Sequence, residues 1–348
     1  MIEIAKYLIG DTQPPFIIAE MSGNHNQSLD RALRLVDAAV EAGAHALKLQ
    51  TASPDGLTLD VDGPDFMISD PGSLWYGKNL YKLYQEAATP WEWHAKIFDY
   101  CRERGIIVFS SPFELKAVEL LEELDAPCYK IASFELVDMQ LIRRVAQTGK
   151  PMIMSTGMAT LSDIELAVNV ARNEGNNQIV LLKCTSTYPA TPEDSNLITL
   201  PHLRAAFGTE VGLSDHTMGI GVPCAAVALG ATVVEKHFTL SREEGGVDAA
   251  FSLEPHELKQ LVIETERAWQ ARGAVVYGGS EREQASLKYR RSVYISEDVK
   301  EGEILTHENT RVVRPGYGLH PKYLEILIGR RVNQKLKKGT AMSWEFIG

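Results

Sequence analysis

The sequence is poor in cysteine and contains no long apolar run, and both features narrow the class of protein. Its 348 residues include only four cysteines, which lie far apart and form no CxxC pair. Such spacing predicts buried free thiols in a reducing compartment, so we expect a cytoplasmic protein. No stretch reaches the ~18 consecutive apolar residues of a membrane-spanning helix, so we expect no membrane partner. The first residues also lack the basic region and apolar core of a secretory signal.

Positive charge is also in the minority. Lys and Arg together number 35 against 46 Asp and Glu, which gives a formal net charge of −11. This balance argues against a nucleic-acid partner, although it allows a local basic pocket for a small anion. Hydrophobic residues make up 45% and charged residues 23%, so the chain is neither disordered nor fibrous. The length predicts one large domain with an appendage.

What the sequence does contain is a repeated pattern, in which a short apolar run ends in polar residues and a helical stretch follows. Ser28 can cap one such helix, and Gly43 can end it. Eight units of this kind predict a (β/α)₈ TIM barrel, with its site at the strand ends. The alternative, a doubly wound open sheet, would normally carry a Gly-rich turn after the first strand, which is missing. The eight runs are FIIAE (16–20), ALKLQ (46–50), IIVFSS (106–111), CYKIAS (128–133), MIMSTG (152–157), IVLLKCTS (179–186), VGLSDH (211–216) and VVEKHFT (233–239).

Two segments depart from this pattern. The connection 51–89 is unusually long and rich in aromatic residues, which is typical of either a lid or a packing insertion. Beyond the barrel, short strands and turns replace the helices. We therefore expect a catalytic barrel over 1–278, a linker over 279–290 and a small, mostly β domain over 291–348. A domain of that size is marginal alone, so we expect it to dock on another surface.

Two histidines end neighbouring predicted strands. Alternate residues of a strand share a face, so His216 and His237 are expected side by side at the barrel mouth. A single histidine is more often a hydrogen-bonded core residue, but two on adjacent strands favour a metal site. Two imidazoles with oxygen ligands suit Mn²⁺ or Mg²⁺, and suit Zn²⁺ less well.

A second group of strand-end residues is basic or hydroxylated. Buried lysines need anionic company, so the group predicts a site for a phosphate or carboxylate, although a single serine more often caps a helix. Glu20 is either a general base or the partner of a lysine. Arg314, in the tight loop VRPGYGLHP, is either presented to a ligand or an ordinary surface residue. The lysines and serines are Lys48, Ser111, Lys130, Ser133, Ser155, Ser186 and Ser214.

On these residues the sequence resembles the sialic acid synthase family of phosphoenolpyruvate-dependent sugar synthases. The resemblance spans almost the whole chain. It implies a barrel followed by an antifreeze-like, SAF-type domain, and a domain-swapped homodimer in which that domain caps the partner's barrel. The matching stretches are AEMSGNHN (19–26), ALKLQT (46–51), YKIASFE (129–135), STGM (155–158), CTSTYP (184–189), GLSDHT (212–217), EKHFT (235–239) and RPGYG (314–318).

The resemblance also implies roles for single residues. His216 and His237 match the family's metal ligands, and Glu20 matches its catalytic glutamate. Arg314 matches an arginine that reaches the sugar from the partner's capping domain. Phosphoenolpyruvate binding is implied for Lys48, Ser111, Lys130, Ser133, Ser155, Ser186 and Ser214, although many members have asparagine at 186. Sugar binding is implied for Gln50, Tyr188 and Asp248.

The MSGN sequence after the first strand and the RPGYGLHP loop resemble the pseudaminic acid synthase branch. The implied acceptor is open-chain 2,4-diacetamido-2,4,6-trideoxy-L-altrose, which condenses with phosphoenolpyruvate while phosphate leaves by C–O cleavage. A divalent ion on the two histidines would polarise the aldehyde. The alternatives are an N-acetylneuraminate or legionaminate synthase, a Schiff-base aldolase that uses Lys48 or Lys130, and a non-catalytic carbohydrate-binding protein.

Overall fold

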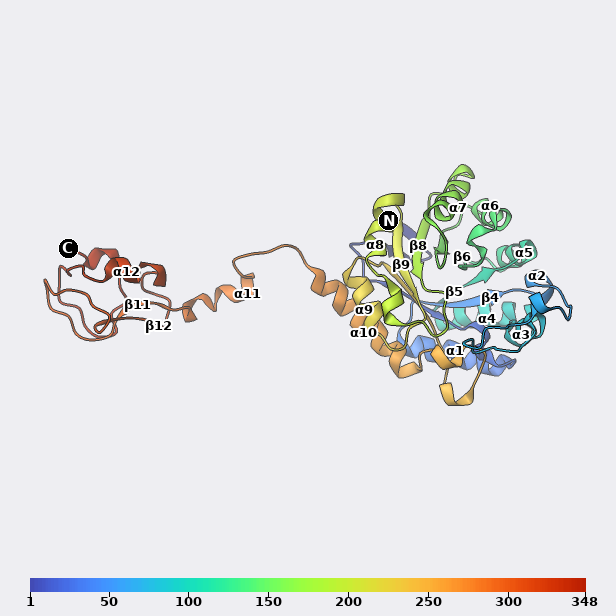
Figure 1. The fold of residues 1–348 in the computed structure, drawn as a ribbon, viewed down its shortest axis with the longest axis horizontal. Helices are drawn as coiled ribbons and strands as arrows, with labels where there is room; N and C mark the ends of the chain where they lie inside the picture. The colour runs from blue at the N-terminus through green and yellow to red at the C-terminus, as the bar shows by residue number, and fades with distance from the viewer. The chain divides into compact units, whose positions relative to one another are not determined.

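The structure is a computed structural model that describes residues 1–348. It divides into two compact units, Met1–Gly273 and Ala274–Gly348. In the first unit eight parallel strands close into a barrel in the order β10-β3-β4-β5-β6-β7-β8-β9, which confirms the predicted (β/α)₈ fold (Figure 1). These strands are β3 (Phe16–Glu20), β4 (Ala46–Thr51), β5 (Ile107–Pro112), β6 (Tyr129–Ile131), β7 (Met152–Ser155), β8 (Ile179–Cys184), β9 (Glu210–Asp215) and β10 (Val233–His237).

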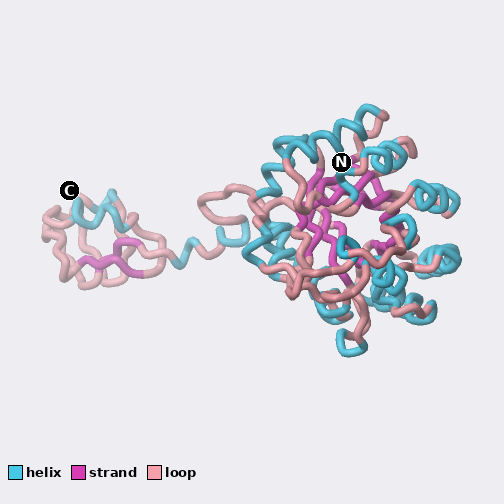
Figure 2. The backbone as a smooth tube through the Cα atoms, turned by 45° about the vertical axis from the view of Figure 1, so that its right-hand side comes forward, coloured by secondary structure: helices cyan, strands magenta, loops and turns pink.

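Helices surround the barrel on the outside, as the backbone trace in Figure 2 shows. The first of them illustrates how the sequence sets its ends. The Ser28 side chain accepts a hydrogen bond from the Arg31 amide, and Gly43 ends the helix at φ 86°, a conformation that favours glycine. The helices of the ring are α1 (Leu29–Ala42), α4 (Trp91–Arg104), α5 (Leu115–Glu123), α6 (Met139–Ala146), α7 (Leu161–Asn173), α8 (Thr199–Phe207), α9 (Gly221–Ala228) and α10 (Pro255–Arg272).

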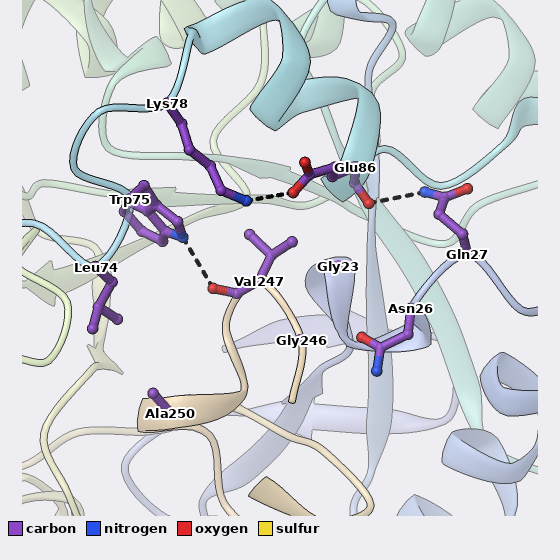
Figure 3. A pocket seen from close by; sticks show the side chains of 10 residues that line it. All are labelled: Gly23, Asn26, Gln27, Leu74, Trp75, Lys78, Glu86, Gly246, Val247 and Ala250. Atoms are coloured by element: carbon purple, nitrogen blue, oxygen red, sulfur yellow. Dashed lines mark hydrogen bonds and ion pairs between the residues drawn. The ribbon is translucent and has the colours of Figure 1, made fainter. Parts of the chain in front are cut away.

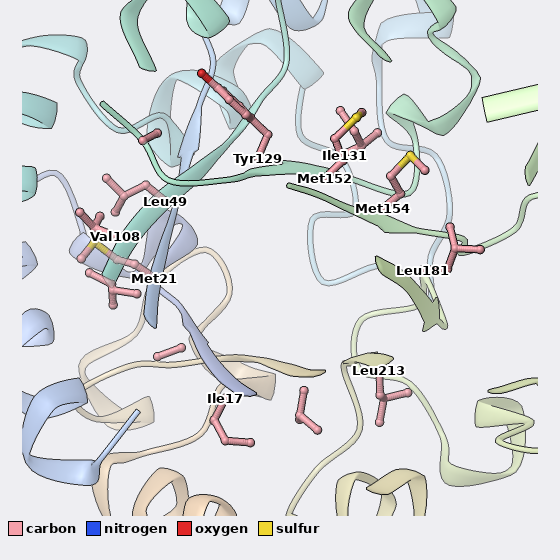
Figure 4. Packing of buried hydrophobic residues seen from close by; sticks show 14 of the residues in the cluster. Ile17, Met21, Leu49, Val108, Tyr129, Ile131, Met152, Met154, Leu181 and Leu213 are labelled. Atoms are coloured by element: carbon pink, nitrogen blue, oxygen red, sulfur yellow. The ribbon is translucent and has the colours of Figure 1, made fainter. Parts of the chain in front are cut away.

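The main core lies between the strands and the helices. Side chains on the outward face of the strands, such as Ile17, Leu49 and Leu213, meet the apolar faces of the helices (Figure 4). Each such fully buried side chain contributes about 1.5–3 kcal/mol of transfer free energy. This continuous layer holds the barrel in its closed form.

A second core fills the barrel interior at the amino-terminal end of the strands. We call its residues the lower layer: Phe16, Ile18, Ala46, Ile107, Phe109, Cys128, Ile153, Val180, Leu182 and Val233. A short antiparallel hairpin, β1 (Ile2–Ile4) and β2 (Tyr7–Ile9), adds Ile4 and Ile9 to this core. On β9 the corresponding position is Gly212, where a Cβ atom would collide with the carbonyl oxygen of Val233 on β10.

The long connection between β4 and β5 contains two further helices, α2 (Pro54–Leu57) and α3 (Leu80–Ala87). The Asn79 side chain caps α3. The other end of α3 is held by the Gln27 side-chain amide, which donates to the carbonyl oxygens of Glu86 (3.0 Å) and Ala88 (2.8 Å). The connection is thus attached to the loop that follows β3.

The second unit has its own small core around β11 (Ser292–Ile295) and β12 (Thr310–Val313), which pair antiparallel. Its two short helices are α11 (Glu281–Gln284) and α12 (Leu324–Leu327). The two units divide after Gly273, a few residues before the predicted end of the barrel domain at 278. No helix in either unit has both the length and the apolar character required to cross a membrane. The core residues are Val293, Ile295, Val299, Leu305, Leu327, Val332, Leu336 and Met342.

Candidate active site

Polar side chains line the barrel interior directly above the lower layer. Because side chains alternate along a strand, the residue two positions after each lower-layer residue faces inward again, closer to the carboxyl end. On β3 and β10, for example, Ile18 is followed by Glu20 and Val233 by Glu235. Every member is buried. We call this set the upper layer: Glu20, Lys48, Ser111, Lys130, Ser155, Cys184, Ser214 and Glu235.

The upper layer contains two lysines and two glutamates in direct contact. The Lys48 ammonium lies 2.6 Å from Glu20 Oε2 and 3.6 Å from Glu235 Oε1, and Lys130 Nζ lies 3.7 Å from Glu235 Oε1. Lys48 also donates to Ser111 Oγ at 3.2 Å, and Gln50 Nε2 donates to Glu20 Oε1 at 3.1 Å. Charges buried in this way are tolerated only when they are paired, so the four groups depend on one another.

Burial and ion pairing shift the pKa values of these lysines and glutamates in different directions. Burial raises the pKa of Glu20, and the opposing charge of Lys48 does not cancel this. For Glu235 burial acts in the same sense, but Lys130 and Lys48 together outweigh it and hold the pKa below its usual range. Burial lowers the pKa of Lys130, with Glu235 opposing. Glu20 is therefore the more basic carboxylate, and a bound anion would favour the charged form of Lys130.

His216 and His237 lie side by side at the ends of β9 and β10, as their spacing predicts. Their ring centroids are 5.2 Å apart. The Thr185 carbonyl oxygen accepts a hydrogen bond from His216 Nδ1 at 2.8 Å, which fixes the tautomer and leaves Nε2 free for a ligand. His237 Nδ1 is buried and has no hydrogen-bond partner. Burial, together with the nearby His216 and Lys48, holds the pKa of His237 well below its usual value, so this imidazole is neutral.

The two histidines are suitable ligands for a divalent metal ion, but the protein offers few other ligands beside them. The neutral His237 imidazole, with its unpaired Nδ1, is a suitable ligand, and the Thr185 carbonyl orients the His216 ring beside it. No group of three or more His, Cys, Asp or Glu side chains is arranged to hold a metal. The histidine pair would therefore supply two ligands to the ion. Its other coordination positions would be filled by ligands that are neither imidazoles nor carboxylates of the protein.

Several hydroxyl groups accompany the charged side chains of the upper layer. Ser155 Oγ is buried without a hydrogen-bond partner, and Ser214 Oγ donates to Glu235 Oε1 at 3.3 Å. The Ser133 and Ser186 hydroxyls approach each other across Gly157, where each would lie 2.6 Å from an added Cβ atom. The predicted serines thus lie in the upper layer or beside Gly157 next to it, and an unpaired buried hydroxyl such as that of Ser155 can bind an anion.

Two residues of this region escaped the sequence analysis. Cys184 occupies the upper layer on β8, with Sγ 4.0 Å from His216 Nδ1. Burial would raise the pKa of its thiol, but His216, Ser133 and Lys130 lower it to about 6. Glu135 follows β6, and its buried Oε2 has no partner. Burial raises the pKa of Glu135 to about 7, against the nearby charge of Lys130. The period of two places Cys184 inside, whereas Glu135 lies beyond the strand, where that rule does not apply.

The residues predicted to bind sugar divide between the two units. The Tyr188 ring lies 4.5 Å from the His216 ring, and Asp248 Oδ2 lies 3.8 Å from His237 Nδ1. Asp248 also accepts a short hydrogen bond from Ser22. Gln50 contacts Glu20, as described above. Arg314 belongs to the second unit, where it is exposed in the loop after β12 and precedes a cis proline.

The fold and this site define a class of (β/α)₈ proteins whose barrel interior carries paired lysines and glutamates beside two histidines, and comparison with known proteins gives the family. The NeuB family matches residues 35–277, and the SAF domain matches residues 290–347. The chain belongs to the NeuB family.

Individual relatives cover nearly the full length. The chain is 45% identical to the pseudaminic acid synthase of Campylobacter jejuni over 327 residues, which are 94% of this chain and 95% of the relative. It is 34% identical to the N,N′-diacetyllegionaminic acid synthase of the same organism, over 92% of this chain and 97% of that one. A crystal structure of N-acetylneuraminic acid (sialic acid) synthetase from Leptospira borgpetersenii, in complex with citrate, is similar at a TM-score of 0.73 and 31% identity, covering 82% and 94%.

Proposed function

We propose that this protein condenses phosphoenolpyruvate with open-chain 2,4-diacetamido-2,4,6-trideoxy-L-altrose to give pseudaminic acid and phosphate. The observation that carries the proposal is the upper layer, in which two buried lysines and several hydroxyls line the barrel interior beside a pair of histidines. This combination suits a small, highly charged anion and an electrophile held next to it. Membership of the NeuB family and the higher identity to pseudaminic acid synthase support the choice.

In this proposal Lys48 and Lys130 neutralise the phosphate and carboxylate of phosphoenolpyruvate. The surrounding hydroxyls of Ser111, Ser133, Ser155, Ser186 and Ser214 donate hydrogen bonds to the same groups. Since these side chains are already buried and fixed, they stabilise developing charge without reorganisation. Burial lowers the pKa of Lys130, and a bound phosphoenolpyruvate would favour the charged form of this side chain.

The bond changes involve both substrates and one water. C3 of phosphoenolpyruvate attacks the aldehyde carbon, whose oxygen takes up a proton to become a hydroxyl. Water adds at C2 with loss of one proton, and the C2–O bond to phosphate then breaks as the C2 hydroxyl becomes the ketone and its proton passes to phosphate. Glu20 accepts the proton that the water loses, a task supported by its burial and raised pKa. When bound by His216 and His237, Mn²⁺ or Mg²⁺ would supply Lewis-acid polarisation of the aldehyde oxygen. Tyr188 and Asp248, which flank the histidines, orient the sugar.

The proposal includes a domain-swapped homodimer whose capping domain brings Arg314 to the partner's sugar. Support comes from the loops that follow β6 to β9, where large apolar side chains are exposed on the catalytic face. Such a patch is typical of an interaction surface. We also place the enzyme in the cytoplasm, where four free thiols are stable. The exposed side chains include Phe134, Val137, Met158, Ile198 and Met218.

Replacing Arg314 tests the capping role. In Arg314→Ala we expect kcat/KM for the sugar to fall by about 10–100-fold, because one charge-assisted contact is lost, while the KM for phosphoenolpyruvate stays unchanged. Steady-state kinetics that vary each substrate in turn will show this difference. Equal effects on both substrates would exclude a sugar-specific role.

A phosphate-release assay tests the reaction itself. The purified protein is incubated with phosphoenolpyruvate, Mn²⁺ and either the diacetamido altrose or N-acetylmannosamine. Release that depends on the diacetamido sugar supports the proposal, whereas faster release with N-acetylmannosamine would identify an N-acetylneuraminate synthase. Covalent trapping of pyruvate on the protein by borohydride, together with a turnover rate that a chelator does not change, would identify a Schiff-base aldolase. Glycan binding without phosphate release would indicate a carbohydrate-binding protein.

A further inference from the structure

A cavity of about 530 Å³ lies between three loops of the barrel's catalytic face (Figure 3). One loop follows β3, one is the long connection between β4 and β5, and one follows β10. None of the predicted site residues lines this cavity. The residues that line it include Asn26, Leu74, Trp75, Lys78, Val247 and Ala250.

Trp75 connects the cavity to the histidine pair. Its indole N–H donates to the Val247 carbonyl oxygen at 3.0 Å, which ties the long connection to the loop after β10. Its ring lies 5.7 Å from that of Tyr188, which in turn lies 4.5 Å from the ring of His216. Val247 directly precedes Asp248, which lies beside His237. The rings of Trp75, in the cavity wall, and of Tyr188 thus connect the cavity to the reaction centre.

The lining combines an apolar wall with a few polar groups. Trp75 uses its N–H within the protein, so it offers a ligand only its ring face, next to Leu74, Val247 and Ala250. The Asn26 amide donates to the Gly245 carbonyl oxygen at 3.1 Å, which leaves Asn26 Oδ1 as an acceptor. Lys78 pairs only with the exposed Glu86, a weak surface pair that a ligand can exchange.

An acetamido group has matching chemistry, because it carries a methyl group, an N–H donor and a carbonyl acceptor. The methyl suits the indole face, the N–H suits Asn26 Oδ1, and the carbonyl suits the Lys78 ammonium. In the proposed reaction the aldehyde carbon C1 lies at the histidines, so the C2 substituent lies near Tyr188 and Asp248. The C4 substituent lies further along the chain and can reach past Tyr188.

We propose that this cavity binds the C4 acetamido group of the acceptor, and that Trp75 determines the preference for diacetamido over monoacetamido sugars. The inference rests on the proposed function and adds to it the subsite that selects the acceptor. A hydrophobic pocket discriminates by about 10–200-fold for a small apolar group, which sets the expected size of the effect.

The test uses calorimetric binding of two alditols, the borohydride-reduced forms of the diacetamido altrose and of N-acetylmannosamine. Neither has an aldehyde, so neither can react. Trp75→Ala removes the ring wall, and Ala250→Trp fills the cavity from an exposed position. Trp75→Phe keeps an aromatic face but loses the hydrogen bond to Val247. Leu59→Ala is the matched control, because Leu59 is exposed on the same connection and does not line the cavity.

We expect Trp75→Ala and Ala250→Trp each to weaken binding of the diacetamido alditol by about 10–100-fold, with less than a threefold change for the N-acetylmannosamine alditol. Trp75→Phe should retain most of the preference, and Leu59→Ala all of it. Equal losses for both alditols, or no loss in Ala250→Trp, would overturn the proposed subsite.

Turnover of the wild-type protein separates this inference from the proposed function. Phosphate release with the diacetamido sugar, combined with an unchanged alditol preference in both variants, would overturn the subsite and leave the function intact. Selective binding of the diacetamido alditol that the variants abolish, without phosphate release from phosphoenolpyruvate, would support the subsite and overturn the function.

Discussion

The lower and upper layers of the barrel interior are built on the same strands and differ in almost every property. In the lower layer Phe16, Ile18 and Phe109 fill the space with hydrocarbon, and the amino-terminal hairpin closes the end. Two residues further along, Glu20 and Ser111 face the same interior with polar groups.

The difference shows how one strand can serve two purposes. The lower layer buries only apolar side chains, whereas the upper layer leaves buried polar atoms of Ser155 and Glu235 without hydrogen-bond partners, as does His237 directly beyond it. Unpaired buried groups cost stability, so their concentration at one end indicates a site made for something that completes them. We therefore expect substitutions in the upper layer to change catalytic activity, and substitutions in the lower layer to change the free energy of unfolding.

The largest effect should follow loss of one histidine. In His237→Ala we expect metal-dependent turnover to fall to background, because half of the protein's imidazole ligands are gone. The melting temperature should change by less than about 3 °C, since Nδ1 of this histidine has no partner to lose. Phosphate release with and without added Mn²⁺, together with thermal unfolding, will check both parts. A rate equal to wild type would show that the pair does not serve a metal.

Loss of an upper-layer lysine should affect both properties. In Lys130→Met we expect kcat/KM for phosphoenolpyruvate to fall by about 10²–10³-fold, as for removal of one preorganised electrostatic group. The free energy of unfolding should fall by about 3 kcal/mol, because Glu235 keeps only Lys48 as its partner.

The double variant Lys130→Met, Glu235→Met separates the two effects. Chemical denaturation should show that it recovers stability, since no unpaired carboxylate is left, while its activity stays low. Recovery of activity along with stability would mean that Lys130 acts only as a structural partner.

A lower-layer substitution should give the opposite result. In Phe109→Ala we expect a loss of about 3–5 kcal/mol in the free energy of unfolding, because the ring is fully buried inside the barrel. The KM for phosphoenolpyruvate should stay unchanged in the protein that remains folded. Denaturant unfolding and kinetics well below the melting temperature will measure both quantities. A rise in KM without a loss of stability would contradict the division between layers.

The smallest effect concerns pH. Burial raises the pKa of Glu135 to about 7, so the folded state holds a proton that the unfolded state has already lost. The contribution of this group to stability is therefore full below the ordinary glutamate pKa and is lost as pH rises through about 7. Glu135→Gln should remove that part of the pH dependence. Denaturant unfolding of both proteins at about pH 5 and about pH 8 will test it, and parallel curves would show that Glu135 is not shifted.

The barrel could be predicted because its signal is local and repeated. The run predicted over 233–239 corresponds to β10 (Val233–His237), and the capped helix after Ser28 corresponds to α1. The neighbouring positions of His216 and His237 followed from the period of two combined with strand order. In contrast, β1 and β2 were missed, because strands of three residues carry too little pattern to detect.

The rest of the site depends on loops, whose paths sequence patterns do not specify. The aromatic residues of the long connection are evident in the sequence. The contact of Trp75 with Tyr188, which follows it by more than a hundred residues, is not. Glu135 was missed for a similar reason, since it lies past the end of β6. The side chains close enough to feel its charge, Tyr84 of α3 and Tyr188 of the loop after β8, come from distant parts of the sequence.

The missing side chain at Gly212 has a consequence far from its own position. It leaves room for the Val233 carbonyl oxygen on β10, with which a Cβ atom at this position would collide. His216 and His237 project from the same two strands, so the gap between their imidazoles is inherited from the backbone below. The distance between these imidazoles thus depends on a residue that contacts neither substrate. A bulkier side chain at this position would push β9 and β10 apart and so move the two imidazoles away from each other.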